Sequence, residues 1–320
     1  MKGIIRMNRI KKNLAFDFRY MHYSKIILAL LVVVVIVNGI LLTMEYQYIS
    51  TSYDEYVYME NYYKENGLNI EEDLNSENYN IVENNDGTTT VDNTILYCYD
   101  TVCRSIYVAT PQYSVSHILE ISILVFPLLF GIMGTLLATT DYKHKIFKHK
   151  ILRYGRNNYY LCKLLSITAI VIGVIVFATF LSKISSIVFY SCICKQFPVD
   201  QFNVGSLEMY TNTITKMGVM CLISITYASI GFLLGVIFKN AIVSICAIST
   251  YLYIIPIFSE YEIKNCCYAV LKNTFDFYGL VNISSHKQID ISVAIIIIIS
   301  LIIMCNIISL FIIKKRSAYN

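Results

Sequence analysis

Residue types that could carry out covalent or metal chemistry are few in this chain, and their spacing forms no recognised site. The five histidines are scattered along the sequence: His22, His117, His144, His149 and His286. There is no HExxH motif, and His144 and His149, five positions apart, do not share a helical face as a metal-binding pair would. None of the thirteen glycines belongs to a GxxxxGKS/T phosphate-binding loop. We therefore predict no catalytic, cofactor-binding or metal-ligating residue, and no ATP hydrolysis by this chain itself.

One enzymatic alternative stays open, because a Ser-His-Asp triad can assemble from distant positions in a sequence. In that case the chain would be a membrane-embedded enzyme whose site includes His117, Glu120 and Lys183, which lie next to apolar segments. No spacing in the sequence favours this alternative over a protein without catalytic residues.

The elements that would position these side chains are membrane helices. The chain is 56% hydrophobic and 15% charged, with a mean hydropathy of +0.56, well outside the composition of ordinary soluble domains. Segments of about 18 to 22 apolar residues are long enough to cross the roughly 30 Å hydrocarbon layer as helices. We predict an all-α polytopic membrane protein with six transmembrane helices, at residues 26–44, 118–139, 164–182, 217–238, 241–258 and 291–313.

The distribution of basic residues predicts the orientation of these helices. Residues 1–25 and residues 141–163 carry seven Lys and Arg each, against one acid each, and the tail 314–320 adds three more. Because positively charged loops stay in the cytoplasm, we expect the chain to lie in the cell membrane with both termini cytoplasmic. The first apolar segment has no small-residue cleavage site after it, so we interpret it as a retained anchor.

The segment between the first two crossings, residues 45–117, has the opposite charge. It contains thirteen Asp and Glu against Lys64 and Arg104, and we predict that it forms a small α+β extracellular domain. The first helix is expected to continue outward as far as Asn66-Gly67, and residues 91–110 are expected to form a β-hairpin. Cys98 and Cys103 flank its turn and are a candidate disulfide. We also expect residues 183–216 and 259–290 to be extracellular.

Two cytoplasmic segments have the pattern of amphipathic helices. In residues 1–25, apolar residues recur every three or four positions among basic ones, which is typical of a helix lying on the inner lipid surface. In residues 140–163, Ile146, Phe147, Ile151 and Tyr154 fall on one side of a short helix that Gly155 ends. A short helix held against lipid offers too little basic surface for nucleic acid, so we predict no nucleic-acid partner.

Polar and small residues inside the apolar segments leave two alternatives each. Asn38, Glu120 and Asn306 either line a translocation path or serve packing, as interhelical hydrogen bonds or as groups at the headgroup level. Small residues at spacings of four, three and four form one smooth helical face that would accept either a helix of the same chain or a second copy of the protein. These residues are Ser224, Ala228, Gly231 and Gly235.

The order of these segments resembles the permease subunits of ABC-2 type ATP-binding-cassette transporters. The local match is ATTDYKHKIFKHKILRYGRNNYYLCKLL, with Asp141 where that family usually has Glu, and with Gly155 and Lys163 at the expected places. The stretch GFLLGVIFKNAIVSI is similar to the hairpin between the family's fourth and fifth helices. The resemblance also implies short re-entrant helices on the extracellular side in residues 259–290.

The resemblance implies a permease, acting as an exporter, that is driven by a separate ATPase chain. That partner would bind ATP and Mg, and a second permease chain, identical or different, would complete the complex. The helix beginning at Asp141 would couple the permease to the ATPase. The residues implied in coupling are Asp141, Tyr142, Lys143, Ile146, Phe147, Lys148, Ile151, Arg153 and Gly155. The alternative function is a membrane sensor or peptide-immunity protein that binds an external ligand without transport.

Overall fold

The structure is a computed structural model that describes residues 14–76, 78–83, 89–207, 209, 211–278 and 287–315. Within these residues, five helices are long and apolar enough to cross a membrane: α2 (Ile26–Glu65), α5 (Ser114–Lys143), α7 (Arg156–Gln196), α8 (Thr213–Phe238) and α11 (Ile291–Lys315). The shorter elements are α3 (Ile70–Leu74), α4 (Thr94–Ala109), α6 (Phe147–Tyr154), α9 (Ala241–Ser249), the π-helical η3 (Thr250–Ile254), α10 (Ile263–Thr274), the 3-10 turns η1 (Val199–Gln201) and η2 (Val204–Ser206), and strands β1 (Ile81–Glu83) and β2 (Thr89–Val91). The prediction of an all-α multi-pass membrane protein is confirmed at this level.

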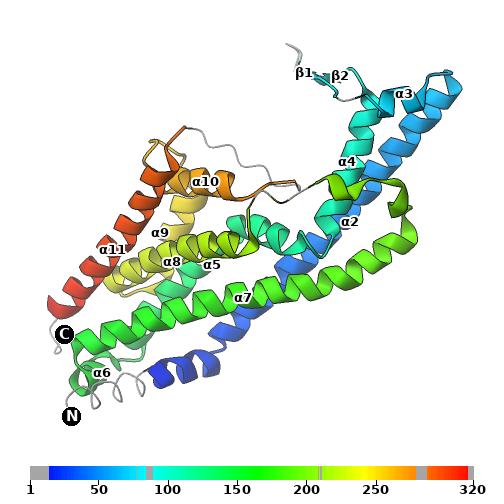
Figure 1. Cartoon of the computed structure of the whole chain (residues 1–320). Helices are drawn as coiled ribbons and strands as arrows, with labels where there is room; N and C mark the ends of the chain where they lie inside the picture. Colours follow the sequence, from blue (N-terminus) through cyan, green and yellow to red (C-terminus); the bar gives the residue numbers. More distant parts are fainter. Residues whose placement is uncertain are drawn as a thin grey trace.

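The described part of the N-terminal segment is helical over residues 14–23, so most of the predicted interfacial helix 1–25 falls outside the described residues. Figure 1 shows that this helix, α6 and the last turn of α11 lie at one end of the molecule, while α3, α4 and the far ends of α2 and α7 lie at the other. We call these the α6 end and the α4 end.

The predicted fifth crossing, residues 241–258, is shorter in the structure. The apolar helix covers Ala241–Tyr253 and its last turn is π-helical, and residues 255–262 are not helical. Thirteen residues rising 1.5 Å each span about 20 Å, less than the roughly 30 Å of hydrocarbon. The segment 259–290 contains α10, and its residues 279–286 lie outside the described part.

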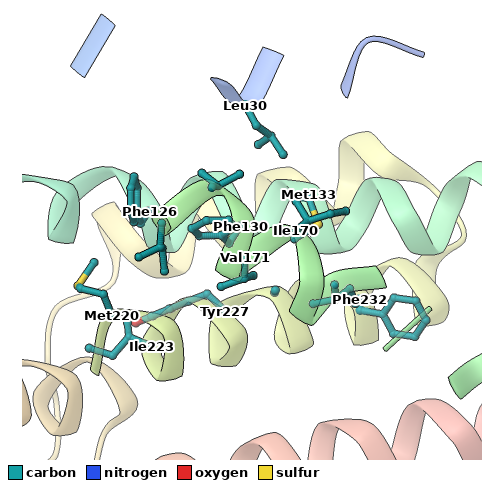
Figure 2. Close-up of a cluster of buried hydrophobic side chains, with 14 of the residues drawn as sticks. Leu30, Phe126, Phe130, Met133, Ile170, Val171, Met220, Ile223, Tyr227 and Phe232 are labelled. Atoms are coloured by element: carbon teal, nitrogen blue, oxygen red, sulfur yellow. The ribbon is translucent and has the colours of Figure 1, made fainter. Parts of the chain in front are cut away.

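Helices α5 and α8 form the centre of the core. Figure 2 shows Phe126 and Phe130 of α5 in one cluster with Val171 of α7 and with Ile223 and Tyr227 of α8. All five side chains are buried. The polypeptide runs in the same direction in both helices, since Gly134 lies against Ala228 and Ala138 lies against Gly235.

The small-residue face of α8 is where α5 approaches most closely. A Cβ atom added to Gly231 would lie 2.0 Å from the carbonyl oxygen of Gly131, and one added to Gly235 would lie 2.7 Å from Cβ of Ala138. The Thr135 hydroxyl donates a hydrogen bond to the Gly231 carbonyl at 3.1 Å. Ser224 and Ala228 are both fully buried. Of the two alternatives for this face, the structure therefore supports packing within the chain, and this surface is not available to a second copy.

The α4 end is mostly helical, with one short two-stranded sheet in the described residues. As predicted, α2 continues well past its apolar part, to Glu65, and the chain turns at Gly67, whose φ is +63°. The strands β1 and β2 pair only over Ile81↔Val91 to Glu83↔Thr89. The predicted hairpin at 91–110 is wrong, because residues 94–109 form the helix α4.

Helical periodicity explains why α4 is not a hairpin. Asn93 caps its start by accepting a hydrogen bond from the Leu96 backbone N–H at 3.1 Å. Val102, Ile106 and Ala109 recur at helical spacing and are buried in a cluster with Ile49 of α2. The β-branched residues that suggested strands are therefore the buried face of a helix, since packing overrides their weak strand preference.

The candidate disulfide is also wrong, because Cys98 and Cys103 are free thiols in the structure. Five residues along a helix rise about 7.5 Å, which is beyond the Cα separation that a disulfide spans. Both side chains are buried, and burial raises the pKa of the Cys103 thiol to about 11.

We expect iodoacetamide at pH 7 to alkylate the exposed Cys192 and Cys194 at least about tenfold faster than Cys98 and Cys103, because only the thiolate reacts and access is limited. The rate at Cys103 should rise as the pH approaches 11. Both rates are measured by labelling the folded protein, digesting it afterwards and quantifying the alkylated peptides by mass spectrometry. Recovery of a peptide pair linked through Cys98 and Cys103 would contradict the structure.

Candidate functional site

A cluster of buried charges joins four segments at the α6 end. Lys150 of α6 contacts Asp17 of the N-terminal helix at 2.6 Å and Asp141 of α5 at 3.0 Å. Lys163 of α7 contacts the same two carboxylates at 3.2 and 3.0 Å. The Tyr159 hydroxyl donates a further hydrogen bond to Asp141 at 2.7 Å. We call these five residues the α6-end ion cluster.

The α6-end ion cluster is electrically balanced, with two carboxylates and two ammonium groups. All four charged side chains are at least 92% buried. Removing such charges from water is costly, and their attraction offsets the cost only while every partner remains in place. Movement of α6 away from α5 or α7 would leave buried charges without partners, so the cluster holds these helices together as a unit.

Helix α6 is amphipathic, but its apolar side faces inward. Phe147 and Ile151 are each only 7% exposed, and the Phe147 ring lies 4.6 Å from that of Tyr142 and 5.5 Å from that of Tyr159. The prediction that Phe147 and Ile151 supply apolar contacts to a partner is therefore wrong. Their burial within the chain's own core is what fixes α6 against α5 and α7.

The outer side of α6 is basic and carries one exposed leucine. Lys148 and Arg153 of α6, and Lys143 at the end of α5, are exposed, as the coupling hypothesis requires. Leu152, beside Arg153 on α6, is 69% exposed. A groove of about 180 Å³ runs between α6 and the N-terminal helix, lined by Phe16, Ile146, His149, Lys150, Arg153 and Tyr154. Gly155 has a φ of +79°, which permits the abrupt change of direction from α6 into α7.

The three residues proposed for a translocation path lie apart from one another. Asn38 donates a hydrogen bond from α2 to Ser185 of α7 at 3.0 Å, and Asn306 of α11 accepts one from the Tyr160 hydroxyl at the start of α7 at 2.5 Å. Ser185 and Tyr160 are about 37 Å apart along α7, at 1.5 Å per residue. These contacts match the interhelical hydrogen-bond alternative for both asparagines.

Glu120, the third of these residues, is fully buried near the start of α5 and accepts a hydrogen bond from the Tyr113 hydroxyl at 2.6 Å. Lys183, proposed with it for an enzyme site, bonds instead to the backbone carbonyl of Pro111.

Sequence reasoning did not assign Asp17 and Lys150 to the site, although each carried a signal. Asp17 is the single acid among the first 25 residues. Lys150 falls three positions after Phe147 and directly before Ile151, which places it on the buried side of the amphipathic helix. A lysine on an apolar helical face predicts a buried anionic partner, because an unpaired buried charge is too costly.

The chain has no match among protein-family models, curated proteins or solved structures in comparisons with each. Within the residues that the structure describes, no group of three or more His, Cys, Asp or Glu side chains is placed to hold a metal ion. The α6-end ion cluster and the outer side of α6 are therefore the features from which a function can be argued.

Proposed function

We propose that the chain is the permease subunit of an ABC exporter, driven by a separate ATPase subunit that binds ATP and Mg. The observation that carries this proposal is the attachment of α6, a short helix beyond the ends of the long apolar helices, to α5 and α7 through the α6-end ion cluster. A helix attached in this way transmits movement of a docked partner to two membrane helices at once.

The mechanism follows from the contacts of α6. Lys150 reaches two carboxylates and Phe147 is buried against the core, so α6 cannot tilt alone without separating buried charges. Displacement of α6 by a partner that closes on ATP would therefore shift the adjoining ends of α5 and α7. In a permease, such a shift would alternate access between the two sides of the membrane.

The docking surface in this proposal is the outer side of α6 rather than its apolar face. We define it as Lys148, His149, Leu152 and Arg153, together with the groove beside Phe16. Three of these groups would meet acidic residues of the ATPase, and Leu152 would fill an apolar depression in it. An exposed leucine amid basic residues is the arrangement expected of a contact centre within a polar rim.

The proposed topology has six crossings, with both termini in the cytoplasm of the cell membrane. Parallel packing of α5 and α8 supports it, because the chain must return across the membrane through α7 between them. The shorter fifth crossing would be completed by residues 255–258 after the π-helical turn. A second permease chain would contact a surface other than the small-residue face of α8, which α5 covers.

We expect replacement of Leu152 by Asp to weaken binding of the ATPase about tenfold or more, because an apolar residue at the contact would become a negative charge facing an acidic partner. The permease would be co-expressed with the ABC ATPase from the adjacent reading frame, and the complex quantified after affinity purification. Leu68→Asp is the matched control, since Leu68 is also an exposed leucine but lies at the α4 end.

Unchanged binding by Leu152→Asp would show that the docking surface is wrong. Failure of the unaltered chain to bind any ATPase, with correct folding, would instead favour the sensor or immunity alternative.

A further inference from the structure

A pocket of about 110 Å³ lies between α5, α8, α10 and the end of α9. The apolar helix α9 ends in the π-helical turn η3, and the chain then returns as α10, which packs into the main core through Cys267 and Leu271. These two side chains, with Met220, Ile223 and Tyr227 of α8, form the buried part of the pocket wall. The pocket therefore belongs to the apolar helices and lies apart from the α6-end ion cluster.

The pocket opens on an apolar surface of the molecule. Two of its lining side chains are exposed, Leu124 of α5 by 55% and Tyr253 of η3 by 60%. Ile254 and Phe258, which follow Tyr253, are 74% and 71% exposed. In a chain with helices long and apolar enough to cross a membrane, an exposed apolar surface between those helices faces lipid. The pocket is therefore entered sideways from the hydrocarbon layer rather than from water.

The size of the pocket fits a narrow occupant. An engineered apolar cavity of about 150 Å³ accepts benzene. A space of about 110 Å³ therefore holds a segment of one hydrocarbon chain and is too small for a fused-ring molecule such as a sterol. Lipid chains are also the molecules present at the mouth in the highest concentration. Size and surroundings together favour a lipid chain as the occupant.

One charged side chain is part of the pocket wall. Among the described residues that line the pocket, only Lys264 of α10 is charged, and it is 4% exposed. Its ammonium group donates a hydrogen bond to the Ile255 carbonyl, lies 3.6 Å from the Glu262 carboxylate and lies 5.0 Å from the centre of the Tyr251 ring. An ammonium group has three N–H donors, and a buried donor without an acceptor is costly. A further acceptor on an occupant of the pocket would therefore stabilise Lys264.

The charges near Lys264 indicate which kind of acceptor fits. Glu262 already balances the ammonium charge, and Glu260 is a second carboxylate close by in the sequence. A further anion would add an uncompensated negative charge, which is costly away from water. A neutral acceptor satisfies the donor and leaves the charge balanced. The ester carbonyl at the head of a lipid acyl chain is such a group, and it is attached directly to a hydrocarbon chain.

We infer that the pocket binds one ester-linked acyl chain of a membrane lipid, and that Lys264 donates a hydrogen bond to the ester carbonyl. The chain enters beside Leu124 and Tyr253 and lies against the buried side chains of α8 and α10. Tyr253 is fixed at the mouth because its hydroxyl donates a hydrogen bond to the Leu124 carbonyl at 2.9 Å. The bound chain fills the space beside the short helix α9 and stabilises its end against α10. This inference does not depend on the proposed transport function.

Photo-crosslinking of the full-length protein in vesicles tests the inference. The vesicles consist of ether-linked phosphatidylcholine with a small fraction of ester-linked phosphatidylcholine that carries a diazirine in its acyl chain, near the ester. After illumination and digestion, mass spectrometry should find the lipid attached to peptides that contain residues 220–227 and 267–271. Leu124→Trp covers the mouth from an exposed position and should remove this attachment. Leu165→Trp, at an exposed leucine of α7, is the matched control and should keep it.

The contact with Lys264 is tested by exchanging the unlabelled lipid. Part of the ether-linked phosphatidylcholine is replaced by the ester-linked lipid with the same headgroup and chain length. We expect the ester to bind about tenfold more tightly, as for one hydrogen bond from a charged group, so the exchange should displace the photoactive lipid. Lys264→Met should abolish this displacement. Lys272→Met, at an exposed lysine of the same helix, should retain it.

Two outcomes would overturn the inference at the pocket itself. One is the absence of lipid from both peptides in the unaltered protein, and the other is attachment that survives Leu124→Trp. Because Leu124 is exposed, that variant does not disturb the buried core. An exchange of ether for ester lipid that leaves the attachment unchanged in the unaltered protein would equally overturn it, since Lys264 would then make no contact with the ester.

Discussion

Replacement of Lys150 by Met is expected to destabilise the protein by about 3–5 kcal/mol, because it breaks a buried ion pair on one side only. The substitution leaves Asp17 and Asp141 buried with Lys163 as their one remaining cation. Methionine fills most of the volume of lysine, so the loss comes from the uncompensated carboxylate rather than from a cavity. The free energy of unfolding in mixed detergent micelles measures it.

Lys148→Met is the matched control, because Lys148 lies on the same helix but its side chain is exposed. We expect a change within about 0.5 kcal/mol there. The double variant Lys150→Met with Asp17→Asn restores charge balance and should be more stable than Lys150→Met alone. Equal stabilities of Lys150→Met and Lys148→Met would show that the α6-end ion cluster does not hold α6 in place.

Replacement of Gly231 by Ala should destabilise the chain by about 3 kcal/mol, through a steric clash rather than a change of charge. The added Cβ would lie 2.0 Å from the Gly131 carbonyl oxygen and 2.9 Å from its carbon. Both are backbone atoms, so relief requires α5 and α8 to separate along a contact that also includes the hydrogen bond from Thr135. The same unfolding measurement, or a lower melting temperature in detergent, would detect it.

Gly173→Ala in α7 is the control for this substitution, since a Cβ there meets no atom within 4 Å. Alanine is the better helix former by about 1 kcal/mol, so this variant should be as stable as the unaltered chain or slightly more so. If Gly231→Ala were equally harmless, α5 and α8 could not be as close as the structure places them.

Much of the molecule could be predicted from the sequence, since length and hydropathy alone indicate membrane helices. Five of the six predicted segments correspond to long apolar helices, and the break after α2 falls at Asn66-Gly67 as expected. The segment 241–258 was the exception, because apolar composition does not reveal where a helix changes to a π-helical turn and ends. Alternation of β-branched and polar residues misled the interpretation of α4, whose packing against α2 decides its conformation.

The sequence by itself determined three properties: that the chain belongs in a membrane, which of its segments are basic and which is acidic, and that a short amphipathic helix precedes α7. These properties depend on local composition and periodicity, which a sequence displays directly. The tertiary structure alone decided which side of α6 is buried, that α5 covers the small-residue face of α8, and that Asp17 meets Lys150 across 133 positions. The physical reason is that a buried charge needs an opposite charge beside it, and a glycine-lined helix face needs a closely packed neighbour. Residues far apart in the sequence supply these partners only once the helices have packed.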